Sequence, residues 1–129
     1  MILVDSDVLI AHLRGRLEAR SWLREARTSR GKLSVSVVTL VEITGAMRSH
    51  ERSEVWRLLS SFRPLPASEP IGYRAGEYQR EYRRSHTGIG LGDYLIAATA
   101  DHHELELATL NVRHFPMFPD LAPPFRLGA

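Results

Sequence analysis

The segment MILVDSDVLIAH (residues 1–12) joins a strand pattern to a helix pattern through two carboxylates. Its first four residues are all apolar, which is typical of a short strand buried on both faces inside a parallel sheet. The residues after them have the apolar spacing of a helix, which Ser6 or Asp7 is placed to cap. Asp5 stands at the carboxyl end of the predicted strand. Burying a carboxylate is costly unless its charge is compensated, so the segment predicts a partner for Asp5.

Outward from this segment, strand and helix patterns keep alternating along the chain. Helices are predicted over residues 6–15, 17–28, 38–46, 52–62, 70–85 and 93–105, and short strands over residues 2–5, 33–35 and 106–110, with a short strand or a turn over residues 63–68. A glycine-bearing loop, residues 86–92, precedes the last helix, and the proline-rich tail, residues 119–129, has room for one edge strand. The alternation predicts one α/β domain over residues 1–129, with a mainly parallel central sheet flanked by helices in three layers.

The composition is that of a globular chain without cysteine chemistry. Apolar residues make up 43% of the 129 residues and charged residues 25%, and the absence of cysteine rules out disulfides and thiolate metal ligands. No stretch is long enough to span a membrane and the N-terminus does not resemble a signal peptide, so we expect a cytoplasmic protein. The formal net charge is +2, but sixteen of the seventeen basic residues are Arg, the side chain suited to bidentate phosphate contacts.

Three further polar residues interrupt apolar stretches in the way that Asp5 does. Glu42 lies in the middle of a helix that its Val, Leu and Ile neighbours predict to be largely buried, Asp93 opens the last apolar helix, and Asn111 follows the last strand. Ordinary structural roles exist for two of them, since Asp93 can be an N-cap and Asn111 a turn residue. Glu42 has no local partner within its helix. Asp7 is predicted mainly to cap the first helix, and the alternative is that it adds negative charge near the site.

A divalent cation would resolve the charge of these carboxylates if they converge at one edge of the sheet. With Asp5, Glu42 and Asp93 about 5 Å apart, each pair would repel by about 3 kcal/mol at an effective dielectric constant near 20. One of them would then bind a proton, unless a cation lies among them. A ligand set made only of oxygen favours Mg²⁺ or Mn²⁺ over zinc.

Four segments resemble, in order, the four conserved blocks of the PIN-domain family. They are ILVDSDVLIAHLRG, SVVTLVEITGAMR, GIGLGDYLIAATA and LATLNVRHF, which together span nearly the whole chain. The closest resemblance is to VapC-type toxins of bacterial toxin–antitoxin pairs. It implies a metal-dependent endoribonuclease that acts on RNA of the tRNA or rRNA class, is silenced by a VapB-type antitoxin, and forms a homodimer.

The resemblance also implies roles for individual residues. The acidic positions of the family fall on Asp5, Glu42 and Asp93, and a fourth position, commonly acidic, falls on Asn111. Its amide oxygen can accept a hydrogen bond or orient a water but supplies no charge, which leaves open whether one or two metal ions bind. The family's supporting hydroxyls match Ser6 and Thr109.

Two surface expectations follow. Candidates for holding the RNA backbone are Arg80, Arg83, Arg84 and Arg113, although pairing with Glu77 and Glu81 at helical spacing is an equally good interpretation of the helical ones. His86, just before the glycine-bearing loop, is a candidate neighbour of the site. The antitoxin is expected in a groove between the first two helices and the fourth, with the apolar anchors Leu9, Leu13, Trp22 and Trp56.

Two alternatives remain at this point. The VDSDVL motif resembles the opening of haloacid-dehalogenase-type phosphatases, but the single Lys32 comes too early for that family and Ala97 stands where an acid is needed. The other alternative is a PIN-like scaffold that binds a partner or RNA without cleaving it, which the neutral Asn111 keeps open.

Overall fold

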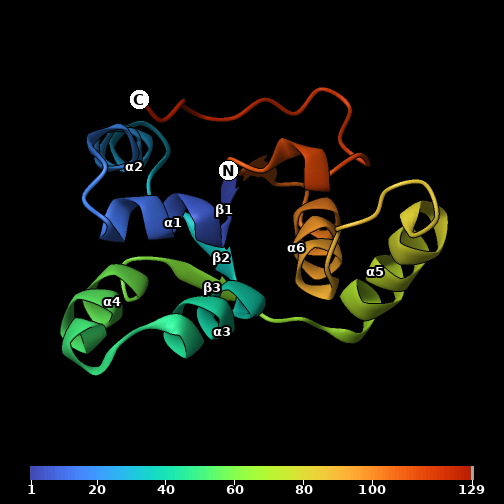
Figure 1. Cartoon of the computed structure of the whole chain (residues 1–129), viewed down its shortest axis with the longest axis horizontal. Coiled ribbons are helices and arrows are strands. Elements are labelled where there is room, and N and C mark those ends of the chain that lie inside the picture. Colours follow the sequence, from blue (N-terminus) through green and yellow to red (C-terminus); the bar gives the residue numbers. More distant parts are fainter. Residues whose placement is uncertain (129) are drawn as a thin grey trace.

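Four parallel strands form the central sheet of the computed structural model, which describes residues 1–128 (Figure 1). They are β1 (Ile2–Val4), β2 (Ser34–Ser36), β3 (Arg63–Leu65) and β4 (Glu106–Ala108). Their order across the sheet is β3-β2-β1-β4, and all three pairings are parallel. Pro64 lies in the edge strand β3, where its missing N–H costs least. The predicted parallel sheet is confirmed.

Six α-helices connect and cover the strands. They are α1 (Ser6–Leu13), α2 (Leu17–Arg30), α3 (Val37–Ala46), α4 (Arg52–Leu59), α5 (Glu69–Tyr82) and α6 (Leu91–His102), with 3₁₀ turns at Ser49–Glu51 and Val112–His114. Each predicted helix is present, with ends displaced by a few residues. Among residues 1–128, no helix is both long and apolar enough to cross a membrane.

The short strand β1 divides the core into two layers because its side chains alternate between the faces of the sheet. Ile2 and Val4 pack with buried residues of α1, α2, α3 and α4, while Leu3 packs with buried residues of α5 and α6. Figure 1 shows the two groups of helices on opposite sides of the sheet. The predicted three-layer α/β/α arrangement is confirmed.

The helix α3 is much less buried than its sequence predicted. Only Thr39 and Ile43 are fully buried, and the Val41 side chain in the same helix is 66% exposed. Its Val residues therefore do not all belong to the core, and the prediction of a largely buried helix is wrong. The consequence for the site is that Glu42 lies on an accessible face of α3.

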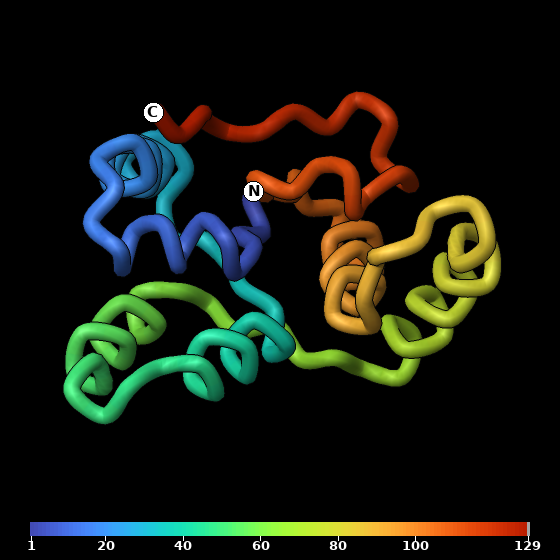
Figure 2. Tube along the Cα trace, in the orientation of Figure 1, coloured from blue at the N-terminus to red at the C-terminus, as the bar shows by residue number. Residues whose placement is uncertain are grey.

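The C-terminal tail runs back across the molecule to α2 (Figure 2). Phe125 packs near Trp22 with ring centroids 6.1 Å apart, and Gly128 bonds to the side chains of both Arg16 and Glu18. No strand forms in the described part of the tail, so the edge strand allowed there does not occur. The tail contains three prolines, and a proline lacks the backbone N–H that strand pairing needs.

The order of the strands places a topological switch point at the carboxyl ends of β1 and β4. The chain moves from β1 outward to β2 and β3, and then crosses back to add β4 on the other side of β1. Ligands bind at such switch points in open α/β sheets. The backbone N–H of Asp5 donates to Ala108 at 2.9 Å, which extends the ladder and brings Asp5 beside Thr109.

Candidate active site

Asp5 is a buried carboxyl at the end of β1 and the N-cap of α1. Its residue is 5% exposed, its Oδ1 accepts from the Ser6 N–H at 2.8 Å, and its Oδ2 accepts from the Thr109 hydroxyl at 2.8 Å. Burial raises the pKa of Asp5 to about 7, the Asp7 and Asp93 charges add to this effect, and the two hydrogen bonds oppose it. The protein thus holds Asp5 in surroundings that disfavour its charge.

Asp7 does not cap α1, so the role predicted for it is wrong. Asp5 occupies the N-cap position, and Asp7 reaches across to the chain after β4, where its Oδ2 accepts from the Leu110 N–H at 3.0 Å and from Thr109 at 3.2 Å. Its Oδ1 is buried without a hydrogen-bond partner in residues 1–128. Burial raises the pKa of Asp7 as well. Asp7 is therefore a second carboxyl of the site.

The Thr109 hydroxyl links these two carboxyls. It is fully buried, lies within hydrogen-bond distance of both Asp5 and Asp7, and accepts from the Asn111 N–H at 3.1 Å. Because a hydroxyl carries a single hydrogen, it serves one of the two carboxylates at a time. The opposite ends of the chain are joined here through polar groups.

Glu42 reaches the same region from α3. Although much of the residue is exposed, its Oε2 lies 3.3 Å from the point where a Cβ on Gly92 of α6 would stand. Burial against α6 raises the pKa of Glu42, the charges of Asp93 and Asp7 raise it further, and the Ser6 side chain lowers it. Glu42 therefore lies within electrostatic reach of two other carboxylates of the site.

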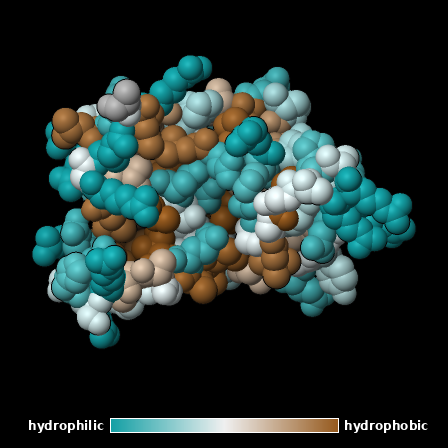
Figure 3. Space-filling view, in the orientation of Figure 1, coloured by the Kyte–Doolittle hydropathy of each residue, from teal (hydrophilic) through white to brown (hydrophobic). Residues whose placement is uncertain are grey.

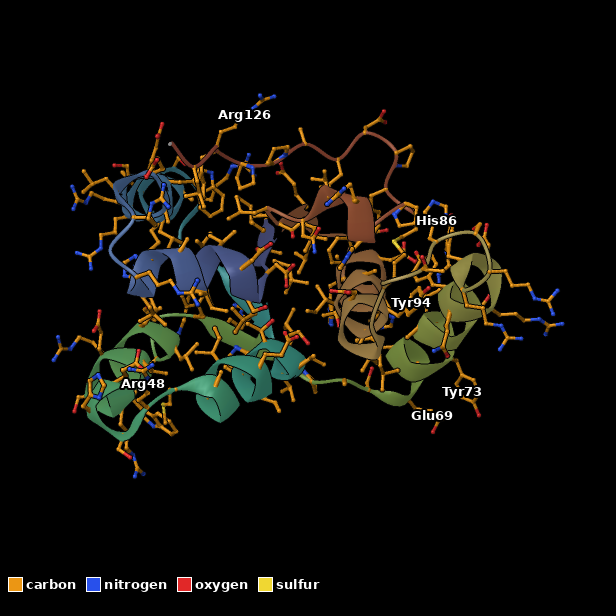
Figure 4. All side chains as sticks on the ribbon, in the orientation of Figure 1. Arg48, Glu69, Tyr73, His86, Tyr94 and Arg126 are labelled. Carbon is orange, nitrogen blue, oxygen red and sulfur yellow. The ribbon has the colours of Figure 1, made fainter. Side chains whose placement is uncertain are left out.

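Asp93 lies in the first turn of α6 and combines a structural contact with an exposed face. Its Oδ2 accepts from the Gly90 N–H at 3.0 Å, so it helps to cap the helix without being the N-cap residue. The same oxygen lies 3.0 Å from His114 Nδ1, and the Asp93 side chain is 23% exposed. The neighbouring Tyr94 lies on the α5 side of α6 (Figure 4) and is buried in the core.

His114 is a neighbour of the site that the sequence did not reveal. Its Nδ1 lies 2.9 Å from Asn111 Nδ2 as well as 3.0 Å from Asp93. The signal in the sequence was weak. Asn111 and His114 are three residues apart, which places them on one side of a 3₁₀ turn, but the turn itself was not predicted.

No Lys or Arg among residues 1–128 forms an ion pair with the carboxylates of the site. In residues 1–128, neither Asp5, Asp7 nor Glu42 forms an ion pair, and Asp93 pairs only with His114. Within residues 1–128, no three His, Cys, Asp or Glu side chains are close enough together to bind one metal ion in their present conformations. The chemistry of the donors nevertheless fits a hard divalent cation, because the free Asp7 Oδ1 and the disfavoured charge of Asp5 both call for a positive partner.

The arginines proposed to hold RNA lie outside this cluster. Arg80, Arg83, Arg84 and Arg113 are exposed and none of them forms an ion pair in the described residues. Glu77 pairs with Arg74 at 3.6 Å instead, so the alternative of Glu-paired arginines is not realised for these four. His86 bonds to Ser85 and packs against Tyr82 in the loop after α5 (Figure 4), outside the carboxylate cluster.

The four residues predicted as antitoxin anchors differ in exposure. Leu9 is fully buried, so it is wrong as an anchor, whereas Trp22 is half-buried and packs near Phe125 of the tail. A hollow of about 360 Å³ lies instead between α1, α3 and α4, and Leu13 lines it with Ile43. Trp56 lines a separate hollow with Leu40, Leu59 and Pro64.

Comparison with known proteins identifies the family. The family model of the PIN domain matches residues 2–119. This match favours the PIN-domain interpretation over the haloacid-dehalogenase-type phosphatase. The sequence is 66% identical over 125 residues to Ribonuclease VapC10 of Mycobacterium tuberculosis, covering 97% of this chain and 93% of that protein. It is 38% identical over 125 residues to Ribonuclease VapC19 of the same organism, covering 97% of this chain and all of that protein. A toxin–antitoxin complex from Klebsiella pneumoniae contains a chain of the same fold, with a TM-score of 0.80 at 29% identity, covering 98% of this chain and 100% of that one. The chain therefore belongs to the PIN domain family, and within it to the VapC group.

Proposed function

We propose that the protein is a metal-dependent endoribonuclease and the toxin of a toxin–antitoxin pair. The observation that carries the proposal is the group of carboxylates at the switch point of the sheet, whose charge no Lys or Arg of the described residues neutralises. The ribonuclease names of its relatives and the likeness to a toxin–antitoxin complex support it. The cofactor is Mg²⁺ or Mn²⁺.

The ligands of the cation are Asp5, Glu42 and Asp93, and Asn111 is a further catalytic residue whose amide accepts a hydrogen bond or orients a water. The Thr109 hydroxyl and the Ser6 backbone N–H support Asp5, because each donates a hydrogen bond to its carboxylate. A divalent cation, when bound, lowers the pKa of a coordinated water and polarises the phosphoryl group. It also favours the ionised form of Asp5, against the effect of burial.

The residues of the chain then orient the reactants. Asp93 or Glu42 orients the attacking water and accepts its proton, and attack in line with the leaving oxygen gives 5′-phosphate and 3′-hydroxyl ends. Arg80, Arg83, Arg84 and Arg113 contact the phosphates of the RNA, because their guanidinium groups are exposed and form no ion pairs within residues 1–128. The substrate is of the tRNA or rRNA class.

The antitoxin docks in the hollow between α1, α3 and α4. The lining of this hollow is mixed, with apolar side chains from α1, α3 and α4 beside charged ones, and this suits a short amphipathic helix. Figure 3 shows an apolar area over the seam between α1 and α4, and Figure 4 shows Arg48 at its rim. Arg14 and Arg48 line the hollow beside the single carboxylate of Glu51, and neither arginine forms an ion pair among the described residues, which favours an acidic partner segment. The homodimer and the cytoplasmic location stay predictions.

Cleavage of purified tRNA and rRNA by the antitoxin-free protein tests the proposal. We expect cleavage with Mg²⁺ or Mn²⁺ and none with EDTA. Asp5→Asn and Asp93→Asn should each lower the rate by about 100-fold or more, since each removes a ligand of the cation. Asp120→Asn, which makes the same change in the exposed tail, should leave the rate unchanged.

Circular dichroism and thermal unfolding show whether each variant remains folded. Cleavage that persists in folded Asp5→Asn and Asp93→Asn would identify a contaminating nuclease and contradict the proposal. Binding of RNA without cleavage under any metal condition would instead favour the non-catalytic scaffold that the neutral Asn111 leaves open.

A further inference from the structure

Asp93 has a contact that its role in the proposed site does not require. His114, at the end of the 3₁₀ turn Val112–His114, brings Nδ1 to 3.0 Å from Asp93 Oδ2. The next residue, Phe115, is 1% exposed and packs with the core beneath α5 and α6. This anchor fixes the turn, so the position of the imidazole beside Asp93 is set by the fold and not by a mobile loop.

The surroundings of His114 Nδ1 determine which atom carries the proton. An ionised Asp93 can only accept hydrogen bonds, and a bare Nδ1 would set two acceptors against each other at 3.0 Å. Nδ1 therefore carries a hydrogen and donates it to Asp93. The Asn111 amide group, 2.9 Å away, must then turn its oxygen toward Nδ1, because two N–H donors would otherwise face each other.

This arrangement saturates one oxygen of Asp93 and leaves the other free. Oδ2 receives the Gly90 N–H at 3.0 Å and the His114 Nδ1–H, while Oδ1 accepts no hydrogen bond from residues 1–128. Two donors from separate segments fix the plane of the carboxylate. Hydrogen-bonded carboxylates of this kind bind metal ions in a defined orientation.

We propose that His114 is a positioning residue, which holds Asp93 Oδ2 through Nδ1–H so that Oδ1 is the oxygen presented to the cation. The inference rests on the proposed function, because it assigns His114 a part in the same site. A positioning role for His114 differs from a purely structural role in what its loss changes. Without the Nδ1–H donor, the Asp93 carboxylate becomes disordered, while the fold and the RNA-binding surface are retained.

Three variants separate the hydrogen bond from the bulk of the ring. His114→Phe keeps a planar ring but has no donor, whereas His114→Asn places an amide N–H close to the position of Nδ1. His103→Phe makes the first change at an exposed position at the end of α6 and serves as the matched control. Thermal unfolding confirms that each variant is folded.

Titration calorimetry with Mn²⁺ alone measures the effect on the cation. We expect His114→Phe to bind Mn²⁺ 10- to 100-fold more weakly, as is usual when a hydrogen-bond partner of a metal ligand is removed. His114→Asn should recover most of the affinity, and His103→Phe should bind as the wild type does. In RNA cleavage, kcat should fall in His114→Phe while KM stays unchanged, because the phosphate contacts are intact.

A ¹⁵N-correlated NMR spectrum of the histidine rings tests the proton assignment without any metal or RNA. Nδ1 of His114 should be protonated in the wild type, and its signal should shift in Asp93→Asn. A bare Nδ1 in the wild type, or unchanged Mn²⁺ affinity and kcat in His114→Phe, would overturn the inference. A wild-type protein that neither binds Mn²⁺ nor cleaves RNA would contradict the proposed function itself, and the two failures are therefore distinguishable.

Discussion

Asp5 couples the stability of the protein to pH in the direction opposite to that of a typical carboxylate. Its pKa is 3.8 in an unfolded chain and rises to about 7 in the fold, mainly because it is buried. Between these two values the folded protein keeps a proton that the unfolded chain has lost. The contribution of Asp5 to stability is therefore fully present below about pH 4 and is lost as the pH rises toward 7.

We accordingly expect the metal-free protein to be less stable at pH 8 than at pH 5. One pKa unit corresponds to about 1.4 kcal/mol, and about two units of the shift lie between pH 5 and pH 7, so Asp5 accounts for no more than about 3 kcal/mol over this window. Urea unfolding in EDTA at pH 5, 6, 7 and 8 measures the trend. Asp5→Asn should flatten it, leaving the smaller dependence due to Asp7 and Glu42, whose pKa values are raised in the same direction. An unchanged slope in Asp5→Asn would show that another group carries the effect.

Single residues also show where sequence reasoning succeeds. Asp5, Glu42, Asp93 and Asn111 were found because each interrupts an apolar stretch, and the structure brings all four to one edge of the sheet. Asp7 and His114 were missed or misassigned because their partners are remote in the chain. Asp7 bonds to a residue 103 positions away and His114 to one 21 positions away. No local pattern encodes such contacts.

At the level of elements, the sequence predicted where the helices lie but not how deeply each is buried. The apolar pattern predicted the helix α3 correctly, but two of its Val residues lie on its exposed face, so its apolar composition predicted more burial than the structure has. The fit between α3 and α6 depends instead on a residue without a side chain. Gly92 of α6 lies against Val38 and Glu42 of α3.

This contact predicts that Gly92→Ala impairs the site more than the fold. A Cβ there would stand 3.3 Å from Glu42 Oε2 and 3.4 Å from Val38 Cγ1, so the Glu42 carboxylate must move by a few tenths of an ångström. Alanine favours a helix over glycine by about 1 kcal/mol, which offsets the crowding. We expect a several-fold loss of Mn²⁺ affinity and of cleavage rate, with the free energy of unfolding changed by less than about 1 kcal/mol.

Gly76→Ala in α5 is the matched control, because nothing lies within 4 Å of its added Cβ. It should raise stability by up to about 1 kcal/mol without affecting Mn²⁺ binding or cleavage. If both variants behaved alike in the cleavage assay, the contact between Gly92 and Glu42 would have no part in the function.

On the scale of the whole molecule, the sequence predicted a parallel sheet but did not predict the order of its strands. Each strand has only three residues, and their pairing is fixed by side chains from both helical layers. The tail illustrates the same limit. It crosses to α2 and packs Phe125 near Trp22, which reduces the exposure of a residue that the sequence presented as free for a partner. Exposure of such residues depends on the complete fold.

The hollow between α1, α3 and α4 is the surface proposed for the antitoxin, and Ala46→Glu tests it. Ala46 is exposed and lines the hollow between α1, α3 and α4, so a glutamate there fills the hollow while the core is undisturbed. An acidic partner segment would also be repelled by the new charge. We expect the Kd for the antitoxin, measured by titration calorimetry, to rise by at least about 10-fold, equivalent to about 1.4 kcal/mol. Cleavage of RNA by the variant alone should match the wild type.

Ala67→Glu, the same change at an exposed position before α5, should bind the antitoxin normally. Equal affinity of both variants would place the antitoxin elsewhere, and the hollow beside Trp56 would be the next surface to test.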